Sequence, residues 1–407
     1  MWKITLSDLR LHPDDHAAVL EVLQSNWLTM GPKTAAFEAA FAEALDPVAP
    51  PYAYAVTNCT VGLHLALAAL DVGAGDEVIV PSLTFVASAN AALYTGATVV
   101  LADVVGPDDL TLDVDDVLAK VTPRTRAVVP VHYAGQPCDL ARLLPACAQR
   151  GIAVVEDAAH SPLADTILDD AGTVRALGTC GEIGAYSFFS NKNLATGEGG
   201  MLVTRRADLA ERIRLMRAHG MTTVTLDRHK GHAYSYDVIE LGWNYRLDEM
   251  RSALGLSQLK RLPEGNRRRA EVVARYHDAL AARVPEVGVP FASRLPQGRT
   301  AWHILPVVLP PGIERTAVQD SMKAAGIQTS IHYPPIHTFT WHKHSDRVVA
   351  DRLPHTDALA PRLLTLPLYP TLRDDEVDDV VNALGDAVRA QRPLQVAAAA
   401  LAAGGGA

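Results

Sequence analysis

Short apolar runs alternate with stretches of helical length between Tyr54 and Leu262. The runs are rich in Val, Ile and aromatic residues, as buried strands are: Tyr54–Thr57, Glu77–Val80, Ala97–Asp103, Ala127–His132, Ala153–Asp157 and Gly184–Phe189. The helical stretches between them include Thr60–Leu70 and Phe85–Tyr94. This alternation predicts an α/β fold with a mainly parallel central sheet and helices on both faces.

The pattern changes near Pro263, where a smaller α+β unit begins. A helix over Leu247–Leu262, with Asp248 as its N-cap, is followed by an Arg-rich connecting helix. The segments predicted after Pro263 are a helix (Asn266–Val284), a strand (Trp302–Leu309), a helix (Thr316–Ala325), a strand (Ile327–Tyr333) and a helix (Asp374–Arg389). We therefore expect a large domain with an N-terminal segment over residues 1–262, a small C-terminal α+β domain over 263–395, and a disordered Ala/Gly tail over 396–407.

Composition narrows the class of protein. The chain has 407 residues, of which 48% are hydrophobic and 20% charged, and its formal net charge is −9. That charge argues against binding to nucleic acid or to an anionic membrane. The charged N-terminus does not resemble a signal peptide, and no apolar run approaches the roughly 18 residues of a membrane span. Four cysteines without a CxxC pair predict neither a disulfide framework nor a zinc site, so we expect a cytoplasmic protein.

Two charged residues follow neighbouring strands of the predicted sheet. Asp157 ends the strand Ala153–Asp157, and Lys192 lies in the loop 190–200 after the strand Gly184–Phe189. In an open parallel sheet, ligands bind at the carboxyl ends of the strands. Taken alone, Asp157 is also consistent with a helix N-cap, and Lys192 with a solvated surface charge. Lys192 is flanked by aromatic residues, small polar residues and three glycines, and the glycines permit close backbone approach, which favours a lysine held in a pocket.

The chemistry of pyridoxal 5'-phosphate (PLP) requires such a lysine and such a carboxylate. The lysine binds the cofactor covalently and moves protons, while the carboxylate keeps the pyridine nitrogen protonated. Lys192 follows Asp157 by 35 positions with one short strand between them, so adjacent strand ends can bring the two together. Thr60, at the start of a helix, and Ser187 can bind the phosphate, and Phe85 can stack on the ring. Core packing is the alternative explanation for Phe85.

Four motifs occur in order along most of the chain. They are DEVIVPSLTFVASANAALYTGATVVLAD at 76–103, VEDAAH at 155–160, YSFFSNKNLATGEGG at 186–200 and LGWNYRLDEMRSALGLSQL at 241–259. Together they resemble the DegT-type sugar aminotransferases, which are fold-type-I PLP transferases related in architecture to aspartate aminotransferase. The resemblance extends from about Trp27 to Pro370. It implies a PLP-dependent transaminase (EC 2.6.1 type).

The resemblance also implies roles for individual residues around the cofactor ring. Lys192 would be the Schiff-base lysine and Asp157 the partner of the pyridine nitrogen. His160 would lie near the phenolic oxygen of the cofactor, and Phe85 would cover one face of its ring. Some relatives have histidine at the lysine position and act as deoxygenating dehydratases. The lysine at position 192 therefore favours transamination over a PLP-dependent lyase or dehydratase.

A second group of residues corresponds to the phosphate site of the family. Thr60, Val61 through its backbone, and Ser187 would hold the phosphate. Asn244 matches a residue that reaches across a dimer interface to the phosphate of the partner subunit, which implies a homodimer with shared active sites. The run 57–61, Thr-Asn-Cys-Thr-Val, departs from the Ser-Gly-Thr-Ala run that is frequent in the family, and this leaves the role of Cys59 open.

The resemblance to deoxysugar-pathway members implies the substrates. We expect L-glutamate as the amino donor and a nucleotide-linked keto sugar, most simply a dTDP-4-keto-6-deoxyhexose, as the acceptor, in secondary-metabolite or antibiotic biosynthesis. Arg228 and His229 could bind its diphosphate, although an exposed loop explains the segment 227–232 as well. His332 and Tyr333 lie where the small domain of the family approaches the sugar.

Several alternatives stay open at this point. The acceptor could be a dTDP-3-keto sugar or a keto-cyclitol of the scyllo-inosose type, and a non-catalytic sensor of PLP or sugar nucleotide is an alternative from another class. The irregular spacing of four histidines in the segment 332–344, which also holds two prolines, favours a binding loop without a metal ion. We therefore predict no metal site.

Overall fold

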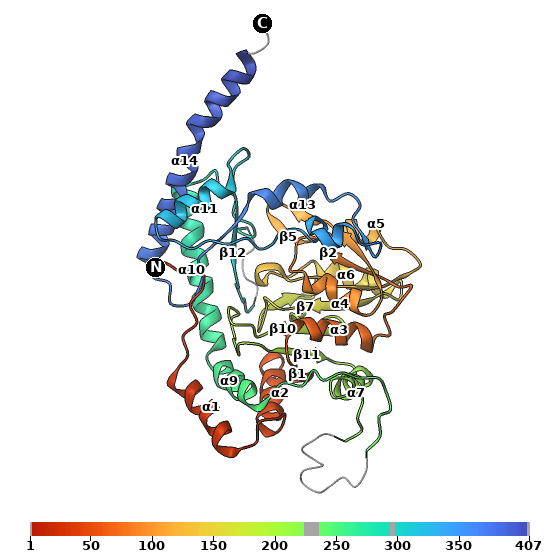
Figure 1. Cartoon of the computed structure of the whole chain (residues 1–407). Helices are drawn as coiled ribbons and strands as arrows, with labels where there is room; N and C mark the ends of the chain where they lie inside the picture. The colour runs from red at the N-terminus through yellow and green to blue at the C-terminus, as the bar shows by residue number, and fades with distance from the viewer. Residues whose placement is uncertain (1, 224–235, 294–297, 405–407) are drawn as a thin grey trace.

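The structure, a computed structural model, describes residues 2–223, 236–293 and 298–404, and of residues 392–404 only the helical backbone. An eight-stranded sheet lies at its centre (Figure 1), with the strand order β1-β11-β10-β7-β6-β2-β3-β13. Strand β11 is antiparallel to both neighbours and the other pairs are parallel. The strands are β1 (Tyr52–Val56), β2 (Glu77–Pro81), β3 (Thr98–Ala102), β6 (Thr125–Val128), β7 (Ala153–Asp157), β10 (Ile183–Ser187), β11 (Gly200–Thr204) and β13 (Val348–Val349). The predicted α/β class with a mainly parallel sheet is confirmed.

Successive side chains of each strand point to opposite faces of this sheet, and an apolar core lies on each face. In β2, Val78 and Val80 pack in one apolar core with Leu65, whereas Ile79 packs in another with Leu143. The helices of this part of the chain are α1 (Pro13–Ser25), α2 (Pro32–Leu45), α3 (Cys59–Ala69), α4 (Ala87–Tyr94), α5 (Val114–Ala119), α6 (Leu140–Ala148), α7 (Ala207–Met216) and α9 (Glu249–Leu259). Asp248 caps α9 as predicted, since its carboxylate accepts the Arg251 N–H.

The C-terminal unit packs beside the sheet around its own core. Its long helices are α10 (Leu262–Arg283), α11 (Arg315–Ala324) and α14 (Asp374–Gly404), which cover the antiparallel pair of β12 (Leu305–Val308) and β14 (Leu363–Leu366). Helix α14 continues past the predicted end at Arg389 and projects away from the rest of the molecule (Figure 1). The segment 396–407, predicted to be disordered, is therefore helical up to Gly404.

Two segments cross between the sheet and the C-terminal unit. The N-terminal residues pair with the C-terminal unit, where Ile4 forms a bridge with Ile327 and packs in its core. In the other direction, the two-residue strand β13 leaves the C-terminal unit and joins the central sheet beside β3. The sequence pattern predicts neither crossing, because both involve only a few residues and no period.

The prediction of a strand over Ile327–Tyr333 is wrong. The described chain forms only isolated bridges there, at Ile327 and at Ser330, before it leaves β14 and brings His332 and Tyr333 into a cavity. The prolines at 334 and 335 have no N–H to continue a ladder. The remaining short elements are β4 (Val104–Gly106), β5 (Asp109–Leu112), β8 (Asp165–Ile167), β9 (Val174–Ala176), α12 (Thr340–Lys343), α13 (Pro354–Leu359), η1 (Tyr133–Gly135), η2 (Ile336–Thr338) and η3 (Ala360–Arg362).

Candidate active site

A cavity of about 580 Å³ opens at the carboxyl ends of the parallel strands. Its walls come from the residues after β2 and β6, from the ends of β7 and β10, from the first turn of α3 and from the C-terminal unit. Nine of the residues predicted to form the site line it together: Thr60, Val61, Phe85, Asp157, His160, Ser187, Lys192, His332 and Tyr333. The fold therefore brings together side chains that lie as far apart as Thr60 and Tyr333 in the sequence.

Lys192 is held in the loop after β10 with its amine turned toward buried polar groups. The backbone N–H of Lys192 donates to the carbonyl of Phe189 (2.8 Å), and the side-chain amine lies 3.3 Å from Nε2 of His303. Burial lowers the pKa of the Lys192 amine to about 8, although the negative charge of Asp157 and the thiol of Cys59 act in the opposite direction. A lysine with this pKa is present in both protonation states near neutral pH, as proton transfer requires.

Asp157 ends β7 and is 5% exposed. Its Oδ2 accepts a hydrogen bond from the Ser88 hydroxyl (2.7 Å) and its Oδ1 accepts the Ala159 N–H (3.1 Å). Burial raises the pKa of Asp157, and the two hydrogen bonds and the charge of Lys192 offset part of that rise. A buried carboxylate whose charge is poorly compensated is ready to pair with a protonated ring nitrogen.

The preceding residue, Glu156, points to the other side of β7 and has a structural role. Its carboxylate accepts the N–H groups of Gly178, Cys180 and Gly181 at 2.7 Å each and pairs with His132 at 2.9 Å. Burial raises the pKa of Glu156, but these hydrogen bonds outweigh it and leave the pKa below its usual value. Of the two consecutive acidic residues, only Asp157 therefore faces the cavity.

The first turn of α3 forms the end of the cavity that suits a phosphate. Asn58 is the N-cap, and its Oδ1 accepts the Val61 N–H at 3.0 Å. The backbone donor predicted at Val61 is thus engaged by the cap in this geometry, whereas the Thr60 side chain lines the cavity. Gly200 lies against the same turn, where a Cβ atom would meet the Asn58 carbonyl carbon at 2.8 Å. A glycine is therefore required for the end of the lysine loop to approach the helix.

Aromatic and imidazole side chains close the opposite side. The rings of Phe85 and Tyr333 lie 5.7 Å apart, and Phe85 is 54% exposed, so it is a cavity wall rather than a core residue. His160 accepts the Ala134 N–H through Nδ1 (3.2 Å), so Nε2 carries the proton and faces the Tyr333 hydroxyl at 3.0 Å. Burial lowers the pKa of His160 well below its usual value and keeps the ring neutral.

Three predicted residues are not part of this cavity. Asn244 is exposed and forms a β-bridge with Ala218, and it is not among the residues that line the cavity of the single chain. Arg228 and His229 lie outside the described residues. Among the residues that the structure describes, no group of three or more His, Cys, Asp or Glu side chains could hold a metal ion.

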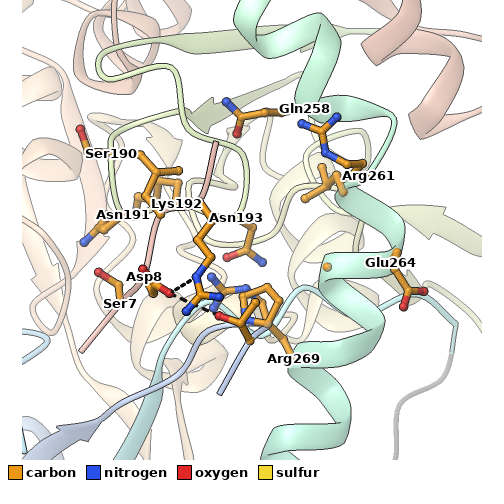
Figure 2. Close-up of a pocket in the computed structure, with 16 residues that line it drawn as sticks. Ser7, Asp8, Ser190, Asn191, Lys192, Asn193, Gln258, Arg261, Glu264 and Arg269 are labelled. Atoms are coloured by element: carbon orange, nitrogen blue, oxygen red, sulfur yellow. Dashed lines mark hydrogen bonds and ion pairs between the residues drawn. The ribbon is translucent and has the colours of Figure 1, made fainter. Parts of the chain in front are cut away.

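A second pocket, of about 280 Å³, lies against the same lysine loop (Figure 2). Figure 2 shows Ser7 and Asp8 of the N-terminal segment on one side and Glu264 and Arg269 of α10 on another. Arg269 is 5% exposed, and its guanidinium donates to the carbonyls of Leu368 (3.0 Å) and His303 (3.3 Å). The C-terminal unit therefore lies across this pocket from the loop of Lys192.

Sequence reasoning missed Ser88 and His303, which contact the two central residues. Ser88 lies three positions after Phe85, on the first turn of α4, and this short spacing was a usable signal. His303 lies 111 positions from Lys192 in a segment predicted as an ordinary strand, so no local pattern marked it.

The fold and the site define a class of enzyme. An amine with a lowered pKa, a buried carboxylate at a strand end, a helix N-terminus with a nearby hydroxyl and an aromatic wall are the groups that PLP requires. They lie on a mainly parallel sheet with a smaller C-terminal unit, which is the architecture of fold-type-I PLP transferases. This donor set fits the cofactor.

The chain belongs to the DegT/DnrJ/EryC1/StrS aminotransferase family, which it matches over residues 10–385. The spore coat polysaccharide biosynthesis protein SpsC of Bacillus subtilis is 39% identical over 378 residues, which cover 91% of this chain and 93% of that protein. The sugar aminotransferase CalS13 from Micromonospora echinospora superposes with a TM-score of 0.82 at 33% identity, covering 94% of this chain and 99% of that one.

A further solved structure bears on the cofactor. Spr1654 from Streptococcus pneumoniae, in its PLP form, superposes with a TM-score of 0.83 at 26% identity, and the match covers 95% of this chain and 98% of that one. The chain is therefore a sugar aminotransferase that uses PLP, and the predicted family, class of enzyme and cofactor are confirmed. No helix of the described chain is long and apolar enough to cross a membrane.

Proposed function

We propose that this enzyme transfers the amino group of L-glutamate to a nucleotide-linked 4-keto-6-deoxyhexose. The roles assigned to the residues rest on one observation, the position of Lys192, whose amine lies in the cavity with a pKa of about 8. PLP, when bound, supplies an electron sink that stabilises negative charge at the reacting carbon. The remaining chemistry falls to side chains of this chain.

Lys192 is the residue that binds the cofactor and then moves protons. Its amine takes a proton from the reacting carbon of the amino donor and returns one to the reacting carbon of the sugar. A positioned acid–base group of this kind contributes about 10²–10⁴-fold to the rate. Asp157 would hold the proton on the pyridine nitrogen, Phe85 would cover one face of the ring, and His160 would lie near the phenolic oxygen of the cofactor. Thr60, on the first turn of α3, and Ser187, at the end of β10, would hold the phosphate.

Tyr333 and His332 are the proposed contacts to the sugar. Tyr333 lies on the cavity wall with its hydroxyl 3.0 Å from His160, so it can approach a group bound over the ring. His332 is 8% exposed, and its Nδ1 lies 2.9 Å from the Thr365 hydroxyl. Burial lowers the pKa of His332 to about 4, so it meets a substrate as a neutral imidazole.

Borohydride reduction of the PLP-loaded enzyme, followed by peptide mass spectrometry, tests the role of Lys192. The PLP mass should be found on the peptide that contains Lys192. Lys192→Ala should abolish turnover, whereas Lys343→Ala, an exposed lysine on α12, should leave it unchanged. PLP attached to another lysine, or full activity of the Lys192 variant, would contradict the assignment.

The substrate is tested with glutamate and a panel of dTDP-4-keto sugars, dTDP-3-keto sugars and keto-cyclitols, with products identified by mass and NMR. We expect amination at C4 of the nucleotide-linked sugar. Amination at C3, or of cyclitols alone, would overturn the substrate assignment and leave the PLP chemistry intact. The glutamate half-reaction, followed as formation of 2-oxoglutarate, distinguishes an active enzyme from a sensor.

We also propose that the enzyme is a homodimer in which Asn244 completes the site of the partner subunit. The support is that Asn244 is exposed and is not among the residues that line the cavity of its own chain. Mixing inactive Lys192→Ala and Asn244→Ala proteins then yields hybrid dimers with one intact site. Recovered activity is expected, and its absence would place Asn244 outside the partner's site.

A further inference from the structure

A branched set of hydrogen bonds begins at two backbone carbonyls behind the lysine loop. The Nδ2 group of Asn266 donates to the carbonyl of Pro162 at 2.9 Å. Its Oδ1 accepts from the Nδ2 group of Asn193 at 2.8 Å, and the same Asn193 Nδ2 donates to the carbonyl of Ala301. Because a carbonyl can only accept, these bonds settle the orientation of both amide groups.

The orientation of Asn193 sets the tautomer of His303. The Nδ2 of Asn193 is used by its two acceptors, so the atom that faces His303 is Oδ1, at 3.2 Å from Nδ1. An oxygen of this kind accepts, so Nδ1 of His303 carries the proton. The other ring nitrogen, Nε2, then presents a lone pair to the amine of Lys192 at 3.3 Å.

The ring of His303 is held in place from several sides. It is 5% exposed and lies 4.5 Å, centroid to centroid, from the ring of His160. The main chain of His303 is held by its N–H, which donates to the carbonyl of Ala134 at 3.0 Å, and by its carbonyl, which accepts from the buried Arg269 at 3.3 Å. Arg269 lines the pocket of Figure 2 together with Lys192 and Asn193.

We propose that His303 is a positioning residue whose unprotonated Nε2 holds the amine of Lys192 whenever that amine is not joined to the cofactor. This inference rests on the proposed role of Lys192. A lysine that moves protons must be released and must return in each half-reaction, and between these events its nitrogen needs a defined resting place. A neutral acceptor can bind both the ammonium and the amine form, because each has an N–H to donate.

Neutrality of the acceptor matters because of the other groups that face Lys192. A carboxylate in place of His303 would hold the ammonium form and raise the pKa of the lysine. Burial, together with the positive charge of Lys192, lowers the pKa of His303 well below its usual value, so the imidazole stays neutral. The other titratable groups that act on Lys192 or feel its charge are Asp157, Cys59, His160 and His332.

The tautomer of His303 is the first test, made on the full-length protein freed of PLP and labelled with ¹⁵N-histidine. Long-range ¹H–¹⁵N spectra, assigned with a His303→Gln sample, should show the proton on Nδ1. Asn193→Leu removes the acceptor of that proton and should shift the ring toward the other tautomer. A wild-type ring protonated on Nε2 would overturn the proposal.

The second test measures the pKa of the Lys192 amine by competitive acetylation across a pH series with peptide mass spectrometry. His303→Phe removes the acceptor and keeps a ring, so the pKa should fall by about one unit, a tenfold loss of proton affinity. His303→Gln keeps an acceptor oxygen and should restore most of this difference if the phenylalanine variant folds poorly. His277→Phe, on α10 beside Trp302, is the matched control and should leave the pKa unchanged.

An unchanged pKa in both His303 variants, or an equal shift in the His277 variant, would refute the role of His303. Neither readout requires catalysis or bound cofactor. A failure of the proposed function would instead appear as PLP trapped on a residue other than Lys192. The two failures are therefore distinguishable.

Discussion

The buried amine of Lys192 should destabilise the cofactor-free protein at neutral pH. Lys192→Met replaces that amine with an apolar group of similar length, which requires no desolvation of a charge. The pKa of Lys192 falls from 10.5 to about 8 in the folded chain. At about 1.4 kcal/mol per unit, the unfavourable contribution to stability is roughly 3 kcal/mol.

Two features of the site reduce this figure. The Lys192 side chain is partly exposed, and Asp157 loses a nearby positive charge when the lysine is removed. We therefore expect the methionine variant to be more stable by about 1–3 kcal/mol at pH 7. The double variant Lys192→Met/Asp157→Asn removes the charge of Asp157 as well. It should therefore be more stable than the single variant, by the free energy that the unpaired Asp157 carboxylate costs.

The dependence on pH has a defined sign. Because the folded pKa of Lys192 lies below the unfolded value, the unfolded chain binds the extra proton between about pH 8 and pH 10.5. The stability of the wild type therefore rises with pH through this window relative to the variant. The advantage of the methionine variant is full below pH 8 and disappears above about pH 10.5.

Urea unfolding of both PLP-free proteins at pH 7 and at pH 10 measures the difference directly. Equal stabilities at pH 7, or an advantage of the variant that does not change with pH, would show that the amine is solvated rather than buried. Addition of PLP should stabilise the wild type more strongly than the variant, because only the wild type can join the cofactor covalently.

Three further changes test the surroundings of the site. Ser88→Ala removes the hydroxyl that donates to Asp157, so the pKa of Asp157 should rise further and PLP retention in equilibrium dialysis should weaken about tenfold. Gly200→Ala places a Cβ atom 2.8 Å from backbone at the start of α3, so unfolding experiments should show a loss of about 1–3 kcal/mol. Glu156→Gln leaves N–H donors and His132 without their carboxylate, with an expected loss of about 3–5 kcal/mol at pH 7. Since the folded pKa of Glu156 is lowered, that loss should shrink as pH falls through it, and a loss that persists in acid would contradict the reasoning.

The strands of the central sheet were largely readable from the sequence. The prediction for Ala153–Asp157 matches β7 residue for residue, and the runs that became β2, β3, β6 and β10 shifted by only a few residues. Buried parallel strands are short, continuous apolar runs, and these runs are bounded by polar residues or turns. The prediction of a strand over Ile327–Tyr333 failed because the segment forms only isolated bridges at Ile327 and Ser330 and then brings His332 and Tyr333 into the cavity.

The site was predictable where its residues lie in specific local motifs. Lys192 and Asp157 follow strands, Thr60 starts a helix and His160 follows Asp157 by three positions, so sequence and family resemblance place them in one cavity, as the structure does. Val61 shows the limit of that approach, since its N–H is engaged by the Asn58 cap, a detail of local geometry.

The sequence by itself determined most strands and helices around the central sheet, the family and the chemical groups that serve PLP, because these depend on local patterns and residue types. Only the tertiary structure decided what surrounds those groups. Ser88 lies 69 positions from Asp157, and His303 lies 111 positions from Lys192. Both contacts depend on how separate elements pack, and packing between distant segments leaves no periodic trace in the sequence. The same packing sets the burial that lowers the pKa of Lys192, and thereby the chemistry that its amine can perform.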